Sequence, residues 1–190
     1  MGARQVRSGT PLGAADGLSA EVTVGLADER ELAVVGALVV DTYVAQGYVA
    51  SDSPYLAQLR DVETRWREAD VLVARATGQG VVATVTFCLG GSRWANIARP
   101  GEAEFRMLAV RPDQQGHGLG RLLVRACLDR AAAAGATSTV ISTEPEMVVA
   151  QRMYERLGFV RTPERDWAPR PGIDLITYRY DAQRMGRPPT

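Results

Sequence analysis

The amino-acid sequence predicts a single α/β domain with about seven strands and about four helices. The chain has 190 residues, of which 46% are apolar and 23% charged, as in one globular domain with a real core. Segments with period-two alternation are interspersed with segments of helical spacing. No repeat or linker interrupts residues 20–181, so we expect one domain there, with a flexible N-terminal segment over 1–19 and a flexible tail over 182–190.

The first half of the chain predicts a strand, two helices and a hairpin. Asp28 followed by Glu31 is a capping-box pattern, which predicts the start of the first helix. The turn TGQG lies between two apolar runs and indicates a hairpin. The expected bounds are 20–27 for the first strand, 29–46 and 54–68 for the helices, and 70–76 and 80–89 for the hairpin strands.

The second half begins with the loop GGSRWANIARPG, whose length indicates a functional or mobile segment. A long strand follows and ends at Pro112, and the glycine-rich turn QQGHGLG leads into a helix that ends at Gly135. STVIST, FVRT and DLITYRY predict three more strands. The expected bounds are 102–112 for the long strand, 118–134 and 146–157 for the helices, and 138–143, 159–162 and 174–180 for the last strands.

Composition excludes several classes of function. The formal net charge is zero, so no global field draws the chain to nucleic acid or to a membrane, and we expect neither partner. The chain has no Lys, which excludes Schiff-base chemistry. His117, Cys88 and Cys127 do not have metal-ligand spacing, so no metal is expected. No apolar stretch is long enough to span a membrane, and the N-terminus has no apolar signal-peptide core, so we expect a cytoplasmic protein.

Two segments carry a resemblance to a known family. MLAVRPDQQGHGLGRLLV joins an apolar strand to a helix through glycines, and AQRMYERLGFVR follows after one further strand. In this order the pair resembles the acetyl-CoA motifs of the GCN5-related N-acetyltransferase (GNAT) superfamily. The residues that match are Gln115, Gly118, Gly120, Ala150, Tyr154, Gly158 and Phe159.

The resemblance implies a mixed, mostly antiparallel central sheet and an acetyl-CoA-dependent N-acetyltransferase. Such an enzyme transfers the acetyl group to a primary amine of a small molecule or peptide, by direct attack in a ternary complex. Homodimers are common in the family. Its acceptor groove is lined by segments that here contain Tyr43, Tyr48, Tyr55, Trp94 and Trp167.

The glycine-rich turn is the expected binding site of the coenzyme. Backbone N–H groups at the start of a helix bind a pyrophosphate, and glycine permits the close approach. In this family the preceding strand splays from its neighbour, the pantetheine arm fills the gap, and one strand N–H polarises the thioester carbonyl. The residues expected to bind the coenzyme are Leu108, Ala109, Val110, Gln115, Gly116, His117, Gly118, Leu119, Gly120 and Arg121.

Other interpretations of the glycines are weaker. The spacing at 116, 118 and 120 is not G-x-G-x-x-G, and no acidic residue ends strand 138–143, which disfavours a dinucleotide fold or a nucleotide-binding regulator. A P-loop requires Lys. A tight turn that binds nothing remains the structural alternative.

Two residues are expected to be catalytic. Tyr154 matches the family's general acid, which protonates the leaving thiolate, although it also lies on an apolar stripe where it could simply pack. Glu104 is the predicted general base, acting through a water, and Glu102 competes with it. Strand alternation places Glu104, Arg106, Leu108 and Val110 on one face, opposite Phe105, Met107 and Ala109.

Two features leave alternatives open. Met147 stands where the family often has Asn, which puts one polar contact to the coenzyme in question. A non-catalytic acyl-CoA-binding sensor or interaction module of the same fold therefore stays as an alternative. Cys88 is the one candidate nucleophile for a ping-pong route.

Overall fold

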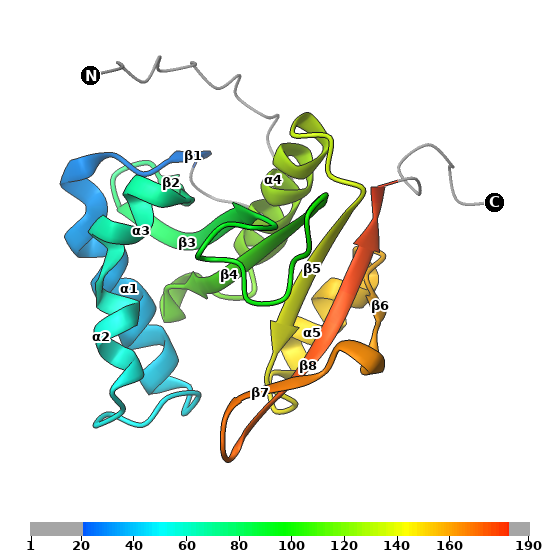
Figure 1. Ribbon diagram of the computed structural model, residues 1–190. Helices are drawn as coiled ribbons and strands as arrows, with labels where there is room; N and C mark the ends of the chain where they lie inside the picture. Colours follow the sequence, from blue (N-terminus) through cyan, green and yellow to red (C-terminus); the bar gives the residue numbers. More distant parts are fainter. Residues whose placement is uncertain (1–20, 183–190) are drawn as a thin grey trace.

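The computed structural model describes residues 21–182; the predicted segment 1–19 and residues 183–190 of the predicted tail lie outside them. An eight-stranded sheet carries helices on both faces (Figure 1). No helix within 21–182 is long and apolar enough to cross a membrane. The strands are β1 (Val22–Leu26), β2 (Asp70–Ala76), β3 (Gly80–Leu89), β4 (Glu102–Val110), β5 (Ser138–Thr143), β6 (Val160–Arg161), β7 (Trp167–Arg170) and β8 (Ile173–Asp181). The α-helices are α1 (Leu32–Ala45), α2 (Tyr55–Arg60), α3 (Val62–Glu68), α4 (Leu119–Ala133) and α5 (Val148–Arg156).

The sheet has the strand order β1-β2-β3-β4-β5-β8-β6, and β7 pairs with β8 beside this path. Every pair is antiparallel except β4 with β5, which is parallel. This confirms the predicted mixed, mostly antiparallel sheet. The predicted hairpin is β2–β3, which closes with Ala76 opposite Gly80.

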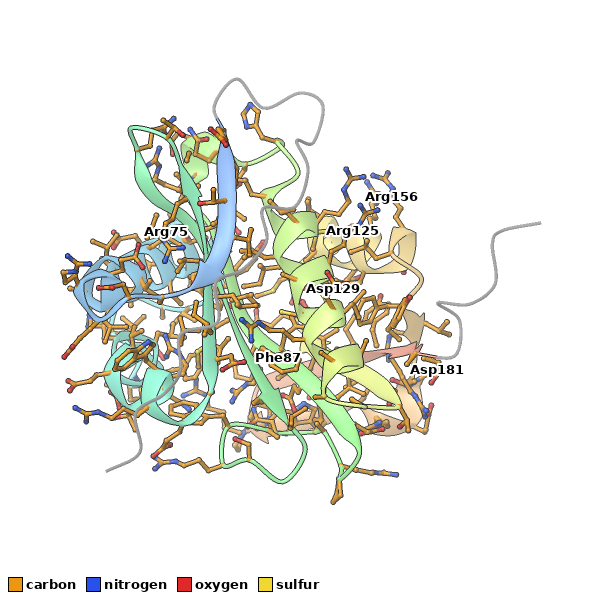
Figure 2. The ribbon with its side chains drawn as sticks, turned by 90° about the horizontal axis from the view of Figure 1, so that it is seen from above. Arg75, Phe87, Arg125, Asp129, Arg156 and Asp181 are labelled. Atoms are coloured by element: carbon orange, nitrogen blue, oxygen red, sulfur yellow. The ribbon has the colours of Figure 1, made fainter. Side chains whose placement is uncertain are left out.

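Helices α1 and α4 lie on opposite faces of the sheet (Figure 2), and a hydrophobic cluster fills each of these two faces. One cluster packs Leu123 of α4 against Phe105 of β4. The other packs Val35 of α1 and Leu59 of α2 with Met107 of β4. Because β4 contributes to both clusters, it is fixed on both faces at the centre of the sheet.

The helix predicted over 54–68 is two helices, α2 and α3. The chain breaks at Asp61, whose ψ is 70° and whose side chain accepts a hydrogen bond from Thr64 N at 3.1 Å, as an N-cap of α3. Arg65, which is fully buried, donates to the carbonyls of Gln58 and Leu59 and so satisfies the end of α2. The apolar stripe alone does not reveal this break, because it continues through both helices.

Strand β7 is absent from the sequence-based prediction. Its short sequence contains Pro169, which cannot donate a backbone hydrogen bond. The sequence pattern therefore does not indicate a strand there. The strand pairs only with β8, and proline is tolerated at such an edge. With β7, the sheet has eight strands rather than about seven.

Candidate active site

The parallel strands β4 and β5 diverge and open a gap in the middle of the sheet. They pair only where 102–104 of β4 lies opposite 138–140 of β5. Beyond this point β5 pairs with β8 alone and β4 with β3 alone, and Figure 1 shows the two strands separating. Residues 105–110 of β4 therefore lack a sheet partner on the side of the gap. Such an edge can pair with an extended molecule that carries amide groups.

A β-bulge lies on the same segment of β4. Arg106 is opposite Thr86 and Ala109 is opposite Thr84, so β4 has one extra residue between these two pairs. Met107 has a φ of +54°, the only positive φ at a non-glycine residue within 21–182. Backbone strain of this kind, about 1–3 kcal/mol, persists where the surrounding structure imposes it, and it gathers at functional sites.

The bulge corrects the predicted alternation of side chains along β4. Phe105 packs on the α4 face, whereas Met107 and Ala109 pack on the α1 face. Leu108 and Val110 contact the α4-face cluster, so they lie on the same side as Phe105 and not opposite it. An extra residue inverts every later position of a strand, and period-two alternation cannot predict it.

The glycine-rich turn joins the carboxyl end of β4 to α4. Gly116 and Gly118 have φ values of +81° and +80°, and a Cβ at either position would meet no atom within 4 Å. Gly118 is the N-cap of α4, and Gln115 braces the turn by donating to the Val110 carbonyl at 3.1 Å. His117 is exposed. The backbone N–H groups of the first turn of α4 have no partner inside the helix, so they are free to bind an anion.

Gly120 has a packing reason of its own. A Cβ there would lie 3.3 Å from the sulfur of Met153, because α4 and α5 approach closely at this point. The absence of a side chain at Gly120 therefore lets the two helices adjoin, whereas Gly116 and Gly118 provide the turn itself. The predicted contacts of all three glycines with the coenzyme stay predictions.

Tyr154 is 3% exposed and lies in an aromatic cluster. Its ring centroid is 5.8 Å from that of Phe105, 5.8 Å from that of Phe159 and 6.3 Å from that of Tyr178. Burial raises the pKa of Tyr154, and no hydrogen bond from the described residues opposes this. The phenol is therefore protonated and able to donate. Its packing role is visible, and its role as general acid stays a prediction.

Glu104 is completely buried and holds a loop. Its Oε2 accepts hydrogen bonds from the backbone N–H groups of Asn96, Ile97 and Ala98, each at 2.9 Å. Its Oε1 accepts none and lies 3.7 Å from Arg106 Nε. Burial raises the pKa of Glu104 despite these contacts. One carboxylate oxygen therefore anchors the loop, and the role of the other as a general base stays a prediction.

Glu102, two residues before Glu104 on β4, holds the same loop. It forms a two-pronged ion pair with Arg165, with N–O distances of 2.9 and 2.8 Å, and accepts from Arg99 N at 2.9 Å. Arg165 also donates to the Ile97 carbonyl at 2.5 Å. The loop predicted to be functional or mobile is thus tied to β4 by two carboxylates. Glu102 is committed to these partners, which leaves it a poor competitor for the role of base.

Neither a reactive thiol nor a metal cluster is found among residues 21–182. Burial, then the charge of Glu104, raises the pKa of Cys88 to about 12, so its thiol stays protonated at neutral pH. Burial also raises the pKa of Cys127. In the described part of the chain, no group of three or more His, Cys, Asp or Glu side chains is placed to hold a metal ion.

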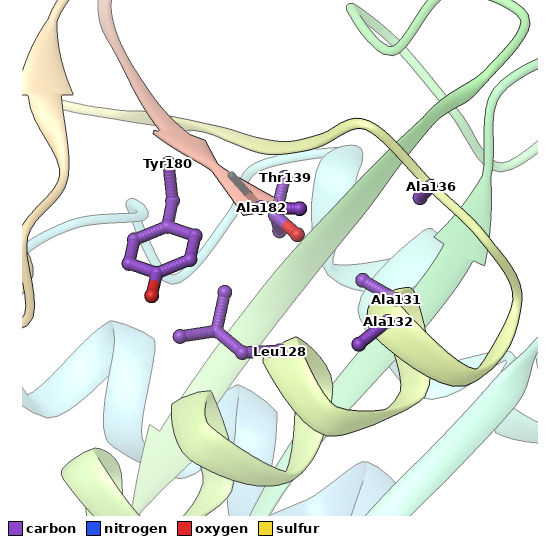
Figure 3. Close-up of a pocket in the computed structure, with 7 residues that line it drawn as sticks. All are labelled: Leu128, Ala131, Ala132, Ala136, Thr139, Tyr180 and Ala182. Carbon is purple, nitrogen blue, oxygen red and sulfur yellow. The ribbon is translucent and has the colours of Figure 1, made fainter. Parts of the chain in front are cut away.

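The hollow in Figure 3 lies away from this gap. It is formed at the carboxyl-terminal end of α4, about 20 Å along the helix from the glycine-rich turn at 1.5 Å per residue. Small apolar side chains dominate its lining, so it has few polar groups to orient a substrate. Its lining residues are Leu128, Ala131, Ala132, Ala136, Thr139, Tyr180 and Ala182.

Two of the tyrosines expected near the acceptor groove are in contact with each other. Tyr43 of α1 and Tyr48 after α1 pack edge to face, with ring centroids 6.0 Å apart. Burial raises the pKa of both phenols, and the negative charge of Glu144, which directly follows β5, adds to the shift. The sequence pattern does not single out Glu144. Its one signal is its place at the carboxyl end of a parallel strand, where α/β proteins gather functional groups.

The family model described as Acetyltransferase (GNAT) family matches residues 37–159, which include the glycine-rich turn, the bulge and Tyr154. The chain belongs to this family. The resemblance predicted from the two motifs is therefore confirmed. Relatives of this GNAT chain include mycothiol acetyltransferases. That of Saccharopolyspora erythraea is 37% identical over 71 residues, 37% of this chain and 23% of that protein. That of Cellulomonas flavigena is 34% identical over 105 residues, 54% of this chain and 30% of that protein.

Solved structures share the fold of this GNAT chain. A GNAT acetyltransferase from Staphylococcus aureus Mu50 has a TM-score of 0.69 at 13% identity, covering 85% of this chain and 99% of that chain. A putative acetyltransferase from Salmonella typhimurium, solved with acetyl-CoA, has a TM-score of 0.60 at 24% identity, covering 85% and 94%. At these identities the likeness concerns the fold alone.

Proposed function

We propose that this protein is an acetyl-CoA-dependent N-acetyltransferase that acetylates a primary amine of a small molecule or peptide. The observation that supports this most is the divergence of β4 from β5. It leaves an unpaired backbone edge that runs from the bulge to the glycine-rich turn, with Tyr154 packed against the same strand. Such an edge suits an extended arm that carries amide groups. This arm has a phosphate group at one end and a thioester at the other.

The phosphate end of the ligand would lie at the start of α4. Backbone N–H groups after Gly118 attract a pyrophosphate, and the two positive-φ glycines leave the approach open. Four exposed arginines on the two neighbouring helices add positive charge, in pairs four residues apart that share a helix face. They are Arg121 and Arg125 on α4, and Arg152 and Arg156 on α5. Figure 2 shows Arg125 and Arg156 projecting on the same side of the molecule.

The chemistry would take place at the bulge. The amine nitrogen attacks the thioester carbonyl carbon, the new C–N bond forms and the C–S bond breaks. An N–H group of β4 between Leu108 and Val110 stabilises the negative charge that develops on the carbonyl oxygen. The Tyr154 hydroxyl gives its proton to the leaving thiolate and is reprotonated from solvent. The proton of the amine passes to a base, for which Glu104, acting through a water, is the predicted residue.

The environment of Cys88 favours direct attack in a ternary complex over a ping-pong route. A covalent route needs a thiolate near the carbonyl, and the Cys88 thiol is 4% exposed with a pKa raised to about 12. The acceptor itself is not carried over from the relatives. They are named for mycothiol, but the chain spans less than a third of their length. The predicted cytoplasmic location and homodimer stay predictions.

A non-catalytic acyl-CoA-binding module is the second candidate, and Met147 is the observation that favours it. The Met147 sulfur lies 3.2 Å from the Thr143 hydroxyl and caps no helix N–H, so it supplies none of the polar contact that Asn would. Release of free thiol from acetyl-CoA in the presence of an amine panel separates the two functions. Thiol release that depends on the amine supports the transferase. Tight binding of acetyl-CoA by calorimetry, without any release, supports the module instead.

A further inference from the structure

The free oxygen of Glu104 lies beside a cation. The Glu104 side chain is completely buried, and its Oε1 accepts no hydrogen bond from the described residues. Arg106 Nε lies 3.7 Å from this oxygen, and within 21–182 the carboxylate has no other ion pair. Because the two residues alternate with Phe105 on β4 and both precede the bulge, their side chains share one face of the strand. The position of the cation is thus set by the strand itself.

Arg106 is also fixed to the loop that Glu104 holds. Its side chain is 14% exposed, and its Nη1 donates to the Trp94 carbonyl at 3.0 Å. Glu104 accepts from the N–H groups of 96–98, so the two side chains bind neighbouring parts of the same loop. The guanidinium therefore cannot turn away from Oε1 without breaking its contact with Trp94. Met107, the strained residue of the bulge, follows directly.

The contact suits a carboxylate that has to stay charged and still accept a proton. Burial raises the pKa of Glu104, and the three backbone N–H groups and the charge of Arg106 oppose that rise. No hydrogen bond joins the guanidinium to Oε1, so the cation stabilises the negative charge while the lone pairs of this oxygen stay free. Removal of one partner of a buried ion pair leaves an uncompensated charge in the interior, which is strongly unfavourable.

The other groups around Glu104 do not supply a positive charge. Cys88 lies opposite on β3, and burial raises the pKa of its thiol to about 12, so the thiol is neutral. Val140 lies opposite on β5 and is apolar. Arg165, after β6, is bound to both oxygens of Glu102. The arginine two residues along β4 is therefore the cation that can hold Glu104 in its charged form.

We propose that Arg106 is a positioning residue that keeps Glu104 charged and leaves its Oε1 open to the proton of the acceptor amine. The inference rests on the proposed transferase function and adds a second residue to its proton-accepting site. The amine proton passes through a water to Oε1, and the neutral carboxyl later returns it to solvent. The guanidinium stays charged at every working pH, so Arg106 takes no proton and acts only through Glu104.

Two substitutions at Arg106 test the charge without any substrate. Arg106→Gln removes the charge and keeps an amide that can donate to the Trp94 carbonyl, whereas Arg106→Lys keeps the charge. The carbon-13 NMR signal of the Glu104 carboxyl, assigned by its absence in Glu104→Gln, reports its titration. In Arg106→Gln the titration should move to higher pH, which lowers the ratio of charged to neutral carboxyl about tenfold at a given pH. In Arg106→Lys it should move much less.

Arg93→Gln is the matched control. Arg93 belongs to the same loop but pairs with Glu68 at 3.0 Å, and its side chain is 66% exposed. Its loss removes one positive charge from the loop without touching Glu104, so the titration should not move. An unmoved titration in folded Arg106→Gln, or an equal movement in Arg93→Gln, would overturn the proposal.

The pH profile of kcat/KM links the pair to turnover. The acidic limb of Arg106→Gln should move to higher pH together with the NMR titration, so activity falls about tenfold on the limb and recovers at higher pH. A titration that moves while the limb stays in place would also overturn the proposal. A wild type that releases no thiol from acetyl-CoA, with the titration moved in Arg106→Gln, would remove the transferase function and leave the coupling of Arg106 to Glu104.

A double variant covers the case in which Arg106→Gln does not fold. Combining it with Glu104→Gln removes both charges and leaves none unpaired in the interior. The double variant should therefore resist urea better than Arg106→Gln alone, although it carries one more substitution. A double variant no more stable than Arg106→Gln would contradict the pairing.

Discussion

Phe105 and Met107 lie on opposite faces of β4 although only one residue separates them. Phe105 packs against Tyr154 on the α4 face, and Met107 packs into the α1-face cluster. The bulge that separates them puts Met107 at a φ of +54°. Both faces of β4 are thus filled at the point where the strand leaves β5, so the gap between the strands is held open by packing on either side.

The first prediction concerns the strain at Met107. Met107→Ile introduces a β-branched side chain at a positive φ, where its Cβ substituents clash with the backbone. Met107→Leu has nearly the same volume without that branch and serves as the control. We expect the free energy of unfolding of the Ile variant to fall by about 1–2 kcal/mol more than that of the Leu variant. Urea denaturation measures both, and equal losses would mean that the bulge relaxes.

The second prediction concerns the glycine-rich turn. Gly118→Val places a branched side chain where the phosphate end of the coenzyme would approach, and it should weaken acetyl-CoA binding more than tenfold, about 1.4 kcal/mol or more. Gly78→Val is a matched control, because Gly78 has a similar φ of +75° with nothing within 4 Å and lies in the β2–β3 turn. It should show the same backbone strain and bind normally. Calorimetry with unchanged affinity in folded Gly118→Val would exclude the turn as the phosphate site.

The third prediction concerns Tyr154. Tyr154→Phe keeps the packing with Phe105 and removes the proton donor, so kcat should fall by roughly 10²-fold or more, with acetyl-CoA affinity nearly unaltered. Tyr178→Phe removes a hydroxyl from the same aromatic cluster, one that donates to Glu155 at 3.3 Å, and should keep kcat within a few-fold. Retained turnover in Tyr154→Phe would make Tyr154 a packing residue alone.

The fourth prediction separates the two roles of Glu104. Glu104→Ala leaves three backbone N–H groups without their acceptor and should destabilise the fold by at least about 1 kcal/mol. Glu104→Gln keeps an acceptor oxygen and should be much closer to the wild type in stability. Hydrogen exchange at residues 96–98 should rise in the Ala variant and little in the Gln variant.

The pH profile of kcat/KM then tests the catalytic role. If Glu104 is the base, Glu104→Gln loses or shifts the acidic limb and keeps partial activity at high pH. An unchanged limb in a stable Gln variant would leave Glu104 as the anchor of the loop and nothing more.

Local sequence patterns were sufficient for most elements and for the glycine-rich turn before α4. The capping box of Asp28 and Glu31, and the glycines before α4, act over a few residues, so their spacing reveals them. The bulge at Met107 and the hydrogen bonds of Glu104 to a loop six to eight residues away depend on tertiary packing, which no local pattern encodes.

The last prediction concerns stability at Glu144. Burial raises the pKa of Glu144 above its ordinary value of 4.5, so the folded protein binds this proton more strongly than the unfolded chain does. The stability linked to that proton is fully present below pH 4.5 and is lost as the pH rises through the folded pKa. Glu144→Gln has no such loss, so it should match the wild type in acid and exceed it in free energy of unfolding at pH 7. Urea denaturation at a series of pH values measures the difference, and Glu146→Gln should keep most of the wild-type slope because the Glu144 carboxylate remains. Parallel curves for the wild type and Glu144→Gln would mean that this carboxylate is fully solvated.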